Sequence, residues 1–508
     1  MTFTKLDVAV FVAFYGTVLA FSLVKSRGRR TSADYFLGGR QLPWWLIGVS
    51  IVAANISTEQ FVGMAGQAAG DVGLAVSAWQ LTGAIGIVIV ALTFLPRFLR
   101  AGIYTMPEYL EYRYSPAARA IMSLLTVTIY VAVTMAAVLY SGATTLEIIF
   151  GSTLTTGVAL IAGIAVVYVT WGGLLAAVWA DLFQGIALLL GGFVILVLGV
   201  AAAGGPDAFF TQNADRLHMI LPRDHPELPW SVLVGGIWIP IFYYCGLNQF
   251  IVQRTLAARS LKQGQLGIVF AAALWLLVPF VVVMPGVLSH QLYADRLTRP
   301  DQAYPTLIRE LVPAGMRGFI FAAIAGAVIS SLGSMLNAAS TIFTMDIYKR
   351  HLRRSAGERE LVAAGRLATV VFLAIACLIA VSPRLHGGVF AFIQEFQGYI
   401  SPGILAAFLF GFVVKIAPPS AGVAALVLSA PMYGLLQWQL GHVAYLHRML
   451  LTFVCLLVLM AIITAAWPLQ RAKPLPVRTD IDLTSSVAAR VCGAVVIAAA
   501  VLFFVVFR

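Results

Sequence analysis

"SIVAANISTEQFVG", residues 50–63, places a cluster of polar side chains inside a long apolar stretch. The cluster consists of Asn55, Ser57, Thr58, Glu59 and Gln60. In a lipid bilayer such groups are costly unless they are paired or line a wet cavity. The cluster therefore indicates either a binding site or a hydrogen-bonded contact between helices, and the rest of the chain has to decide between the two.

Composition places the chain in a membrane. Of its 508 residues 60% are hydrophobic and only 11% charged, whereas soluble domains carry about 25% charged residues. Apolar stretches of roughly 20 residues, long enough to cross a bilayer, recur from end to end. We therefore expect an all-α polytopic membrane protein of the cell membrane. The net charge of +12 indicates orientation and not nucleic-acid binding, because the basic residues lie in short loops.

We expect about fourteen transmembrane helices. They are predicted at 6–24, 43–69, 74–95, 119–149, 154–171, 176–202, 230–252, 264–288, 317–344, 361–382, 388–414, 420–438, 446–467 and 486–507. The basic cluster "KSRGRR" follows the first apolar run, so this run is predicted to be a retained helix and not a signal peptide. Most Lys and Arg residues fall in inner loops if both termini lie outside.

Two segments can supply oxygen ligands for Na⁺, a hard cation. The small, polar "AANIS" permits a helix break, which exposes backbone carbonyl groups. In "AGAVISSLGSMLNAAS" (325–340), Ser330 and Ser331 are adjacent and Ala327 lies one turn earlier. The alternative is that these small residues only pack helices together.

Three further segments carry polar groups in apolar helices. "WGGLLAAVWADLFQG" (171–185) contains Asp181, either an ion-exit residue or an interfacial charge. "GGIWIPIFYYCGLNQFIVQR" (235–254) and "FAFIQEFQGYISPG" (390–403) combine helix breakers with amides and aromatic rings. Such rings can stack on a polyol whose hydroxyl groups bond the amides. A solute site at the membrane midplane explains these broken helices together.

These segments, with "SADYFLGGRQLPWW", "GIYTMPEYLEYRY" and "SSLGSMLNAASTIFTMDIY", resemble the sodium:solute symporter family in its sodium/glucose (sodium/galactose) cotransporter branch. The resemblance implies a LeuT-like core of five plus five helices in inverted repeat. The implied division is 1–42 (extra helix and basic loop), 43–202 (first repeat), 203–229 (extracellular loop), 230–414 (second repeat) and 415–508 (three last helices).

The resemblance also implies site residues. The sodium ligands would be Ala53, Ile56 and Ala327 through carbonyls and Ser330 and Ser331 through hydroxyls, with Asp181 at the ion exit. Substrate positions would be Asn55, Gln60, Gln80, Tyr244, Asn248, Trp275 and Gln394. Relatives of this branch commonly have glutamate at Gln80 and lysine at Trp275, so the substrate class is open here. Trp275 could also merely pack.

We therefore expect a sodium-coupled symporter that imports a small neutral polyhydroxylated solute, such as a sugar, and not an enzyme. One Na⁺ per solute is predicted, because Gly333 stands where a second site would need a hydroxyl group. Another solute, such as an inositol, a nucleoside, sialic acid or an amino acid, is the main alternative. A transporter-like sensor would need an effector domain that this chain lacks. The expected partners are Na⁺, the solute and the bilayer; neither nucleic acid nor an obligate protein partner is expected.

Overall fold

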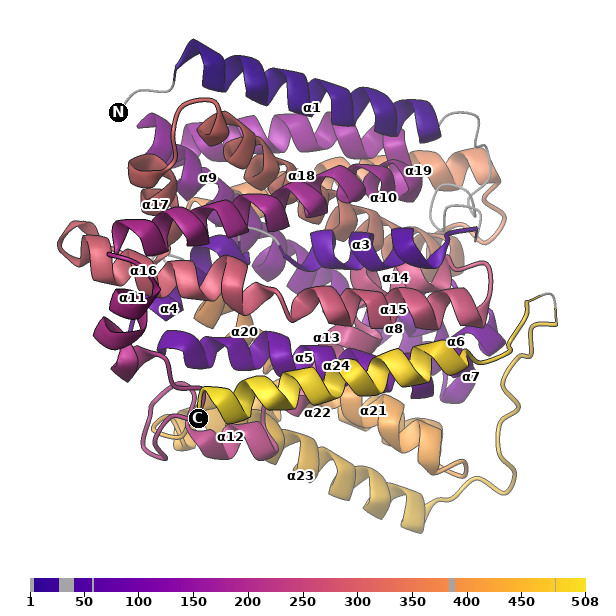
Figure 1. The fold of residues 1–508 in the computed structure, drawn as a ribbon. Helices are drawn as coiled ribbons and strands as arrows, with labels where there is room; N and C mark the ends of the chain where they lie inside the picture. The colour runs from indigo at the N-terminus through magenta and orange to yellow at the C-terminus, as the bar shows by residue number, and fades with distance from the viewer. Residues whose placement is uncertain (1–3, 27–40, 57–58, 383–388, 480) are drawn as a thin grey trace.

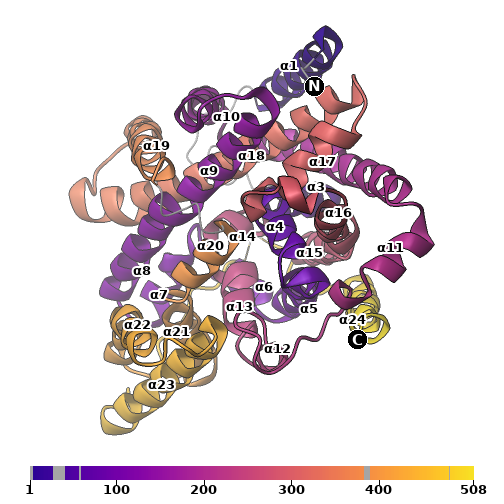
Figure 2. The same ribbon diagram turned by 90° about the vertical axis from the view of Figure 1, so that its left-hand side faces the viewer.

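The computed structural model describes residues 4–26, 41–56, 59–382, 389–479 and 481–508. Within these ranges every regular element is a helix, and most helices run side by side in one bundle (Figure 1). The two termini lie at the same end of the bundle. Seen along the bundle, α3, α4, α14 and α20 occupy the middle, while α1, α19 and α23 lie at the edge (Figure 2).

The first half of the chain begins with α1 (Lys5–Ser26) and reaches the end of the longest helix. Its further helices are α3 (Trp44–Asn55), the π-helix η2 (Glu59–Met64), α4 (Ala65–Ala69), η3 (Gly73–Ser77), α5 (Ala78–Thr93), α6 (Leu95–Ala101), α7 (Met106–Arg113), α8 (Pro116–Ile129), η4 (Tyr130–Met135), α9 (Ala136–Phe150) and α10 (Leu154–Ala202).

The second half begins with short helices in the loop after α10. Its main helices are α11 (Pro206–Gln212), α12 (Trp230–Val234), α13 (Trp238–Leu247), α14 (Gln249–Leu256), α15 (Leu261–Trp275), η6 (Pro279–Val283), α16 (Met284–Tyr293), η8 (Pro300–Gln302), α17 (Ala303–Leu311), α18 (Met316–Ile342), η9 (Phe343–Leu352), α19 (Glu358–Ala380), α20 (Val389–Gln397), α21 (Ser401–Val413), α22 (Pro419–Gln439), α23 (Tyr445–Ala466) and α24 (Val487–Val506).

The number of membrane spans agrees with the sequence in part. The described residues contain 10 helices long and apolar enough to cross a membrane, or 12 if each of two bent pairs is one span. Two shorter apolar helices, Leu154–Val166 and Trp238–Leu247, fall where the sequence predicts two more crossings. α10 is 49 residues long and covers both predicted crossings, 154–171 and 176–202.

Breaks in the helices have local causes. α3 and η2–α4 meet at 52°, and α20 and α21 meet at 45°. In the second pair Pro402 lies in the first turn of α21, where the missing amide hydrogen of proline costs nothing. α13 ends at Asn248, whose φ of −76° and ψ of 116° are extended. Each break frees backbone groups in the middle of the bundle, where the polar clusters of the sequence lie.

Candidate functional site

The break after α3 falls inside the polar stretch that the sequence singled out. Asn55 is the last helical residue, and Ile56 leaves the helix with φ of −78° and ψ of 82°. The Ile56 amide still donates to the Val52 carbonyl at 2.7 Å. Ala53, Asn55 and Ile56 are all buried. Ser57 and Thr58 lie outside the described residues.

Helix α18 packs against this break. The Ser331 hydroxyl lies 3.3 Å from the Ala54 carbonyl oxygen and donates to it. Ala327, Ser330 and Ser331 are fully buried. Gly185 of α10 permits close approach to α3, because a Cβ atom there would lie 3.2 Å from the Ala53 Cβ. The structure therefore brings α3, α10 and α18 together where the sodium ligands are predicted.

Asp181 is at the centre of a buried polar cluster and not at an interface with water. Its carboxylate accepts hydrogen bonds from the Ser50 and Ser330 hydroxyls. It also pairs with the Arg254 guanidinium, whose Nη2 lies 2.9 Å from Asp181 Oδ2. Arg254 follows the predicted span 230–252 by two residues, yet it is not a loop charge: it lies in α14 with its side chain 1% exposed.

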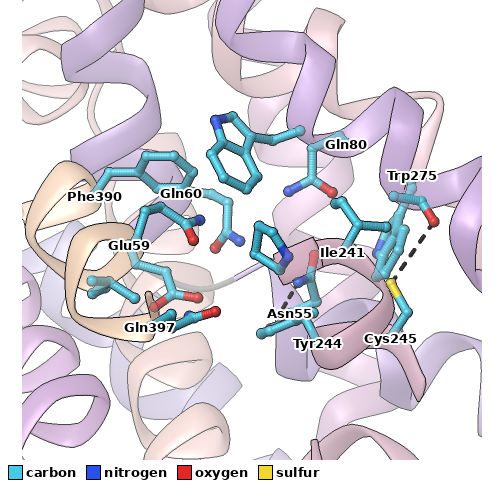
Figure 3. A pocket seen from close by; sticks show the side chains of 15 residues that line it. Asn55, Glu59, Gln60, Gln80, Ile241, Tyr244, Cys245, Trp275, Phe390 and Gln397 are labelled. Carbon is cyan, nitrogen blue, oxygen red and sulfur yellow. Dashed lines mark hydrogen bonds between the residues drawn. The ribbon is translucent and has the colours of Figure 1, made fainter. Parts of the chain in front are cut away.

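A cavity of about 50 Å³ lies beside the broken helices (Figure 3). It is large enough for a few water molecules, since each needs roughly 10–15 Å³ by this measure. Six of the seven predicted substrate residues line it, namely Asn55, Gln60, Gln80, Tyr244, Trp275 and Gln394. The elements η2, α5, α13, α15 and α20 therefore contribute to one site, together with the end of α3.

Two polar atoms at the cavity have no hydrogen-bond partner among the described residues. The Asn55 amide nitrogen donates to the Tyr244 hydroxyl at 2.9 Å, whereas its carbonyl oxygen Oδ1 has no donor. The indole nitrogen of Trp275 is likewise buried without an acceptor. Two residues that line this cavity thus carry a buried acceptor and a buried donor without partners, and a hydroxyl group can satisfy either one.

Asn248 is the predicted substrate residue that does not line the cavity. It is the residue between α13 and α14, and its side-chain oxygen accepts a hydrogen bond from the Tyr130 hydroxyl. The sequence places an amide in a broken helix, but it does not reveal a partner 118 residues earlier. In the structure the side chain of Asn248 therefore fixes the break between α13 and α14 to Tyr130 of η4.

Other lining residues were missed by the sequence interpretation. They are Glu59, Trp79, Gly83, Pro240, Ile241, Cys245, Phe390, Ile393 and Gln397. Glu59 stood in the quoted cluster, and Gln397 in the polar segment 390–403, so both had a signal in the sequence. Phe390 also stood in that segment. Trp79 had no signal, because aromatic residues in apolar helices usually pack; here the rings of Trp79 and Phe390 meet edge to face at 5.7 Å.

The lining has no positive side chain. None of its residues is lysine, arginine or histidine, and Glu59 is its one acidic residue. In Figure 3, Glu59, Gln60 and Gln397 lie on one side, Gln80 and Trp275 on the other, and Asn55 and Tyr244 between them. An anionic solute would find no counter-charge in this lining.

A second cavity of about 200 Å³ shares Phe390 with the first and extends toward the loops. It is bordered by Gln67, His225, Glu227 and Asp301 among others. Burial raises the pKa of the Asp301 carboxyl to about 6, against the lowering effects of the Val389 backbone and Arg299. Burial also raises the pKa of Glu227.

Known proteins resemble both the sequence and the fold. The model of the sodium:solute symporter family matches residues 35–426. A sodium/glucose cotransporter of Vibrio parahaemolyticus is 38% identical, over 95% of this chain and 93% of its own length. Human sodium/myo-inositol cotransporter 2 is 33% identical, over 80% of this chain and 66% of its own.

A solved structure shows the same fold. A Na⁺-coupled sialic acid symporter in a substrate-bound outward-open state aligns with a TM-score of 0.82, covering 93% of this chain and 99% of that one at 22% identity. Fold, family match and sequence identity agree. The chain therefore belongs to the sodium:solute symporter family, whose members are membrane transporters with Na⁺ as the co-transported ion, and it is not an enzyme.

Proposed function

We propose that this sodium-coupled symporter carries a small neutral solute rich in hydroxyl groups, and that this solute is a sugar. The observation that supports the proposal most is the pair of unpartnered atoms at the cavity, Asn55 Oδ1 and Trp275 Nε1. A hydroxyl group both donates and accepts, so a polyhydroxylated solute supplies partners to both. The neighbouring amides of Gln60, Gln80, Gln394 and Gln397 suit further hydroxyl groups.

The aromatic lining supports the same class of solute. Trp79, Tyr244, Trp275 and Phe390 present rings to the cavity, and the apolar face of a sugar packs on such rings. Trp275 replaces a lysine that is common in this branch, yet it still offers a hydrogen-bond donor. A cyclic polyol is the second candidate, because a relative of similar identity is a sodium/myo-inositol cotransporter.

The proposed sodium site uses the break in α3 and the face of α18. Carbonyl oxygens of Ala53, Ile56 and Ala327 and hydroxyl oxygens of Ser330 and Ser331 would hold one ion. The Ser331–Ala54 contact supports this placement. Gly333 offers no side-chain oxygen for a second site, so we propose one Na⁺ per solute.

One Na⁺ is sufficient for strong accumulation. A charge that crosses about 100 mV gains roughly 2.3 kcal/mol, and a tenfold concentration gradient adds about 1.4 kcal/mol. Together, roughly 3.7 kcal/mol permits on the order of 500-fold accumulation of the solute. Both termini are proposed to lie on the extracytoplasmic side, because most Lys and Arg residues then fall in inner loops.

Uptake into proteoliposomes tests the proposal. We expect galactose, glucose or myo-inositol to accumulate under an inward Na⁺ gradient and not under a matched K⁺ gradient. Neutral amino acids and sialic acid are the negative controls. Accumulation of a control compound without that of any polyol would contradict the proposed solute class, whereas equal uptake in K⁺ would contradict the sodium site.

A further inference from the structure

Arg254 is a fully buried cation next to the proposed site of a transported cation. It lies in α14, and its guanidinium reaches residues of three other helices. Its Nε donates to the Ser50 hydroxyl of α3 at 2.5 Å. Its Nη2 donates to Asp181 Oδ2 of α10 at 2.9 Å and to the Ser334 hydroxyl of α18 at 2.5 Å. No role in solute binding explains it, since it does not line the cavity.

The cluster joins directly to the proposed sodium site. The Ser330 hydroxyl donates its hydrogen to Asp181 Oδ1, which leaves the lone pairs of the hydroxyl oxygen free for a cation. Asp181 is therefore the next negatively charged group that an ion leaving Ser330 would meet. Its second oxygen, Oδ2, is already bonded to Ser50 and Arg254.

The charge of Arg254 opposes that movement. Like charges repel strongly in a low-dielectric interior, and a carboxylate that is paired with a guanidinium attracts a further cation only weakly. A buried ion pair is costly to desolvate and adds little stability by itself. Its presence beside a sodium site therefore calls for a role in controlling the ion.

The hydrogen-bonded cluster of Asp181, Arg254 and the serines also joins the two proposed repeats. Asp181 and Ser50 belong to the first, 43–202, and Arg254 and Ser334 to the second, 230–414. Transporters of this architecture alternate their access by moving one part of the core against the other. A movement that separates α14 from α10 would break the pair between Arg254 and Asp181. The same movement would open a path by which Na⁺ leaves its site.

We propose that Arg254 is the gate of the sodium exit. Its guanidinium is paired with the Asp181 carboxylate, the group to which the ion must pass. The pair therefore retains Na⁺ in its site until the core changes conformation. Arg254 is a positioning residue that acts through Asp181, and it does not touch the solute. This inference rests on the proposed sodium site and on no particular solute.

The test is ²²Na⁺ flux into proteoliposomes without any solute, under an imposed membrane potential. Wild type should show a low flux. Arg254→Gln should raise it severalfold, because Asp181 loses its bound cation, and Arg254→Lys should restore most of the block. The matched control is Arg113→Gln, since the buried Arg113 bonds only to backbone carbonyls, among them that of Gly411 at 2.9 Å; its flux should stay at the wild-type level.

Size-exclusion profiles and thermal melts show which variants are folded. If Arg254→Gln does not fold, Arg254→Met takes its place, because it also removes the cation from Asp181 and keeps most of the side-chain volume. A folded variant of either kind without increased solute-free flux overturns the gate. A wild-type protein whose solute uptake ignores Na⁺ would instead contradict the sodium site, so the two failures are distinguishable.

Discussion

The cluster around Asp181 and the solute cavity are both buried and polar, but they differ in whether their polar atoms have hydrogen-bond partners. In the cluster, Asp181, Arg254 and the serines bond to one another, and none of their side-chain atoms is without a partner. In the cavity, Asn55 Oδ1 and Trp275 Nε1 have none among the described residues. A buried polar atom without a partner is costly, so native proteins rarely keep one unless it serves a function.

The two regions also differ in chemistry. The cluster combines a carboxylate, a guanidinium and hydroxyls, which suit the control of a charged ion. The cavity combines amides with aromatic rings, which suit a neutral, hydroxylated molecule. We infer that the polar groups of the Asp181 cluster find their hydrogen-bond partners within the protein, whereas polar groups of the cavity find theirs in the transported solute.

The largest effect is expected from Asp181→Asn, which breaks the closed cluster. It leaves the buried Arg254 charge without its partner, a loss that costs roughly 3–5 kcal/mol in buried pairs. We expect turnover to fall on the order of 100-fold, with a smaller loss of Na⁺ affinity, because the ion exit loses its carboxylate. Transport rates at saturating and limiting Na⁺ separate the two quantities.

The control for Asp181→Asn is Asp346→Asn, which breaks the buried Asp346–Arg119 pair elsewhere. That variant should lose stability without a selective loss of turnover. An Asp181→Asn protein that lost only Na⁺ affinity would mean that Asp181 is a ligand and not an exit residue.

Tyr244→Ala is expected to have the next largest effect, on the solute region. Removing the ring takes away the surface on which the solute stacks, and we expect solute affinity to fall roughly tenfold or more. Tyr244→Phe keeps the ring and loses only the bond from Asn55, which is worth about 1 kcal/mol. Solute competition curves compare the variants, and equal losses in both would argue against stacking.

Ser330→Ala and Ser331→Ala should act on the ion alone. Each removes one proposed hydroxyl ligand, so apparent Na⁺ affinity should fall severalfold, about 1 kcal/mol per lost interaction, while the protein still folds. Ser340→Ala is the control on the same helix, where the hydroxyl bonds the Asn337 carbonyl at 3.1 Å. Unchanged Na⁺ dependence in both site variants would remove these serines from the site.

Trp275→Phe tests whether the unpartnered indole N–H of Trp275 donates a hydrogen bond to the solute. The ring is kept and the N–H is lost, so solute affinity should fall about three- to tenfold if the N–H bonds a hydroxyl. Trp238→Phe is the control, because that indole donates to the Leu233 carbonyl at 2.9 Å and lies outside the cavity. An affinity that is unaltered by Trp275→Phe would show that Trp275 only packs.

The smallest effect is expected on thermal stability, from Asp301 at the second cavity. Burial holds the pKa of Asp301 near 6, above the value of about 3.9 in an unfolded chain. The folded state therefore binds more protons than the unfolded one between these values, and this residue's contribution to stability declines as the pH rises from about 4 to 6. Asp301→Asn should flatten that part of the thermal stability profile, and an unaltered profile would contradict the raised pKa.

Sequence patterns could predict the helical fold and the residues at the break in α3, because a polar cluster in a broken apolar helix is too costly in a bilayer to serve packing alone. They could not place Asn248 or Arg254. An amide or a guanidinium at the end of an apolar segment has the same sequence signature whether it faces solvent, a cavity or a buried partner. Tyr130 and Asp181, the partners that decide between these, are 118 and 73 residues away.

Equilibrium binding of a solute panel to the purified protein in nanodiscs, measured by calorimetry in Na⁺ and in K⁺, tests most directly that the cavity takes a neutral polyol and that Na⁺ supports its binding. We predict that a sugar or cyclic polyol binds in Na⁺ and at least tenfold more weakly in K⁺, a difference of about 1.4 kcal/mol. Binding of only sialic acid or amino acids, or equal binding of the polyol in both salts, would contradict it.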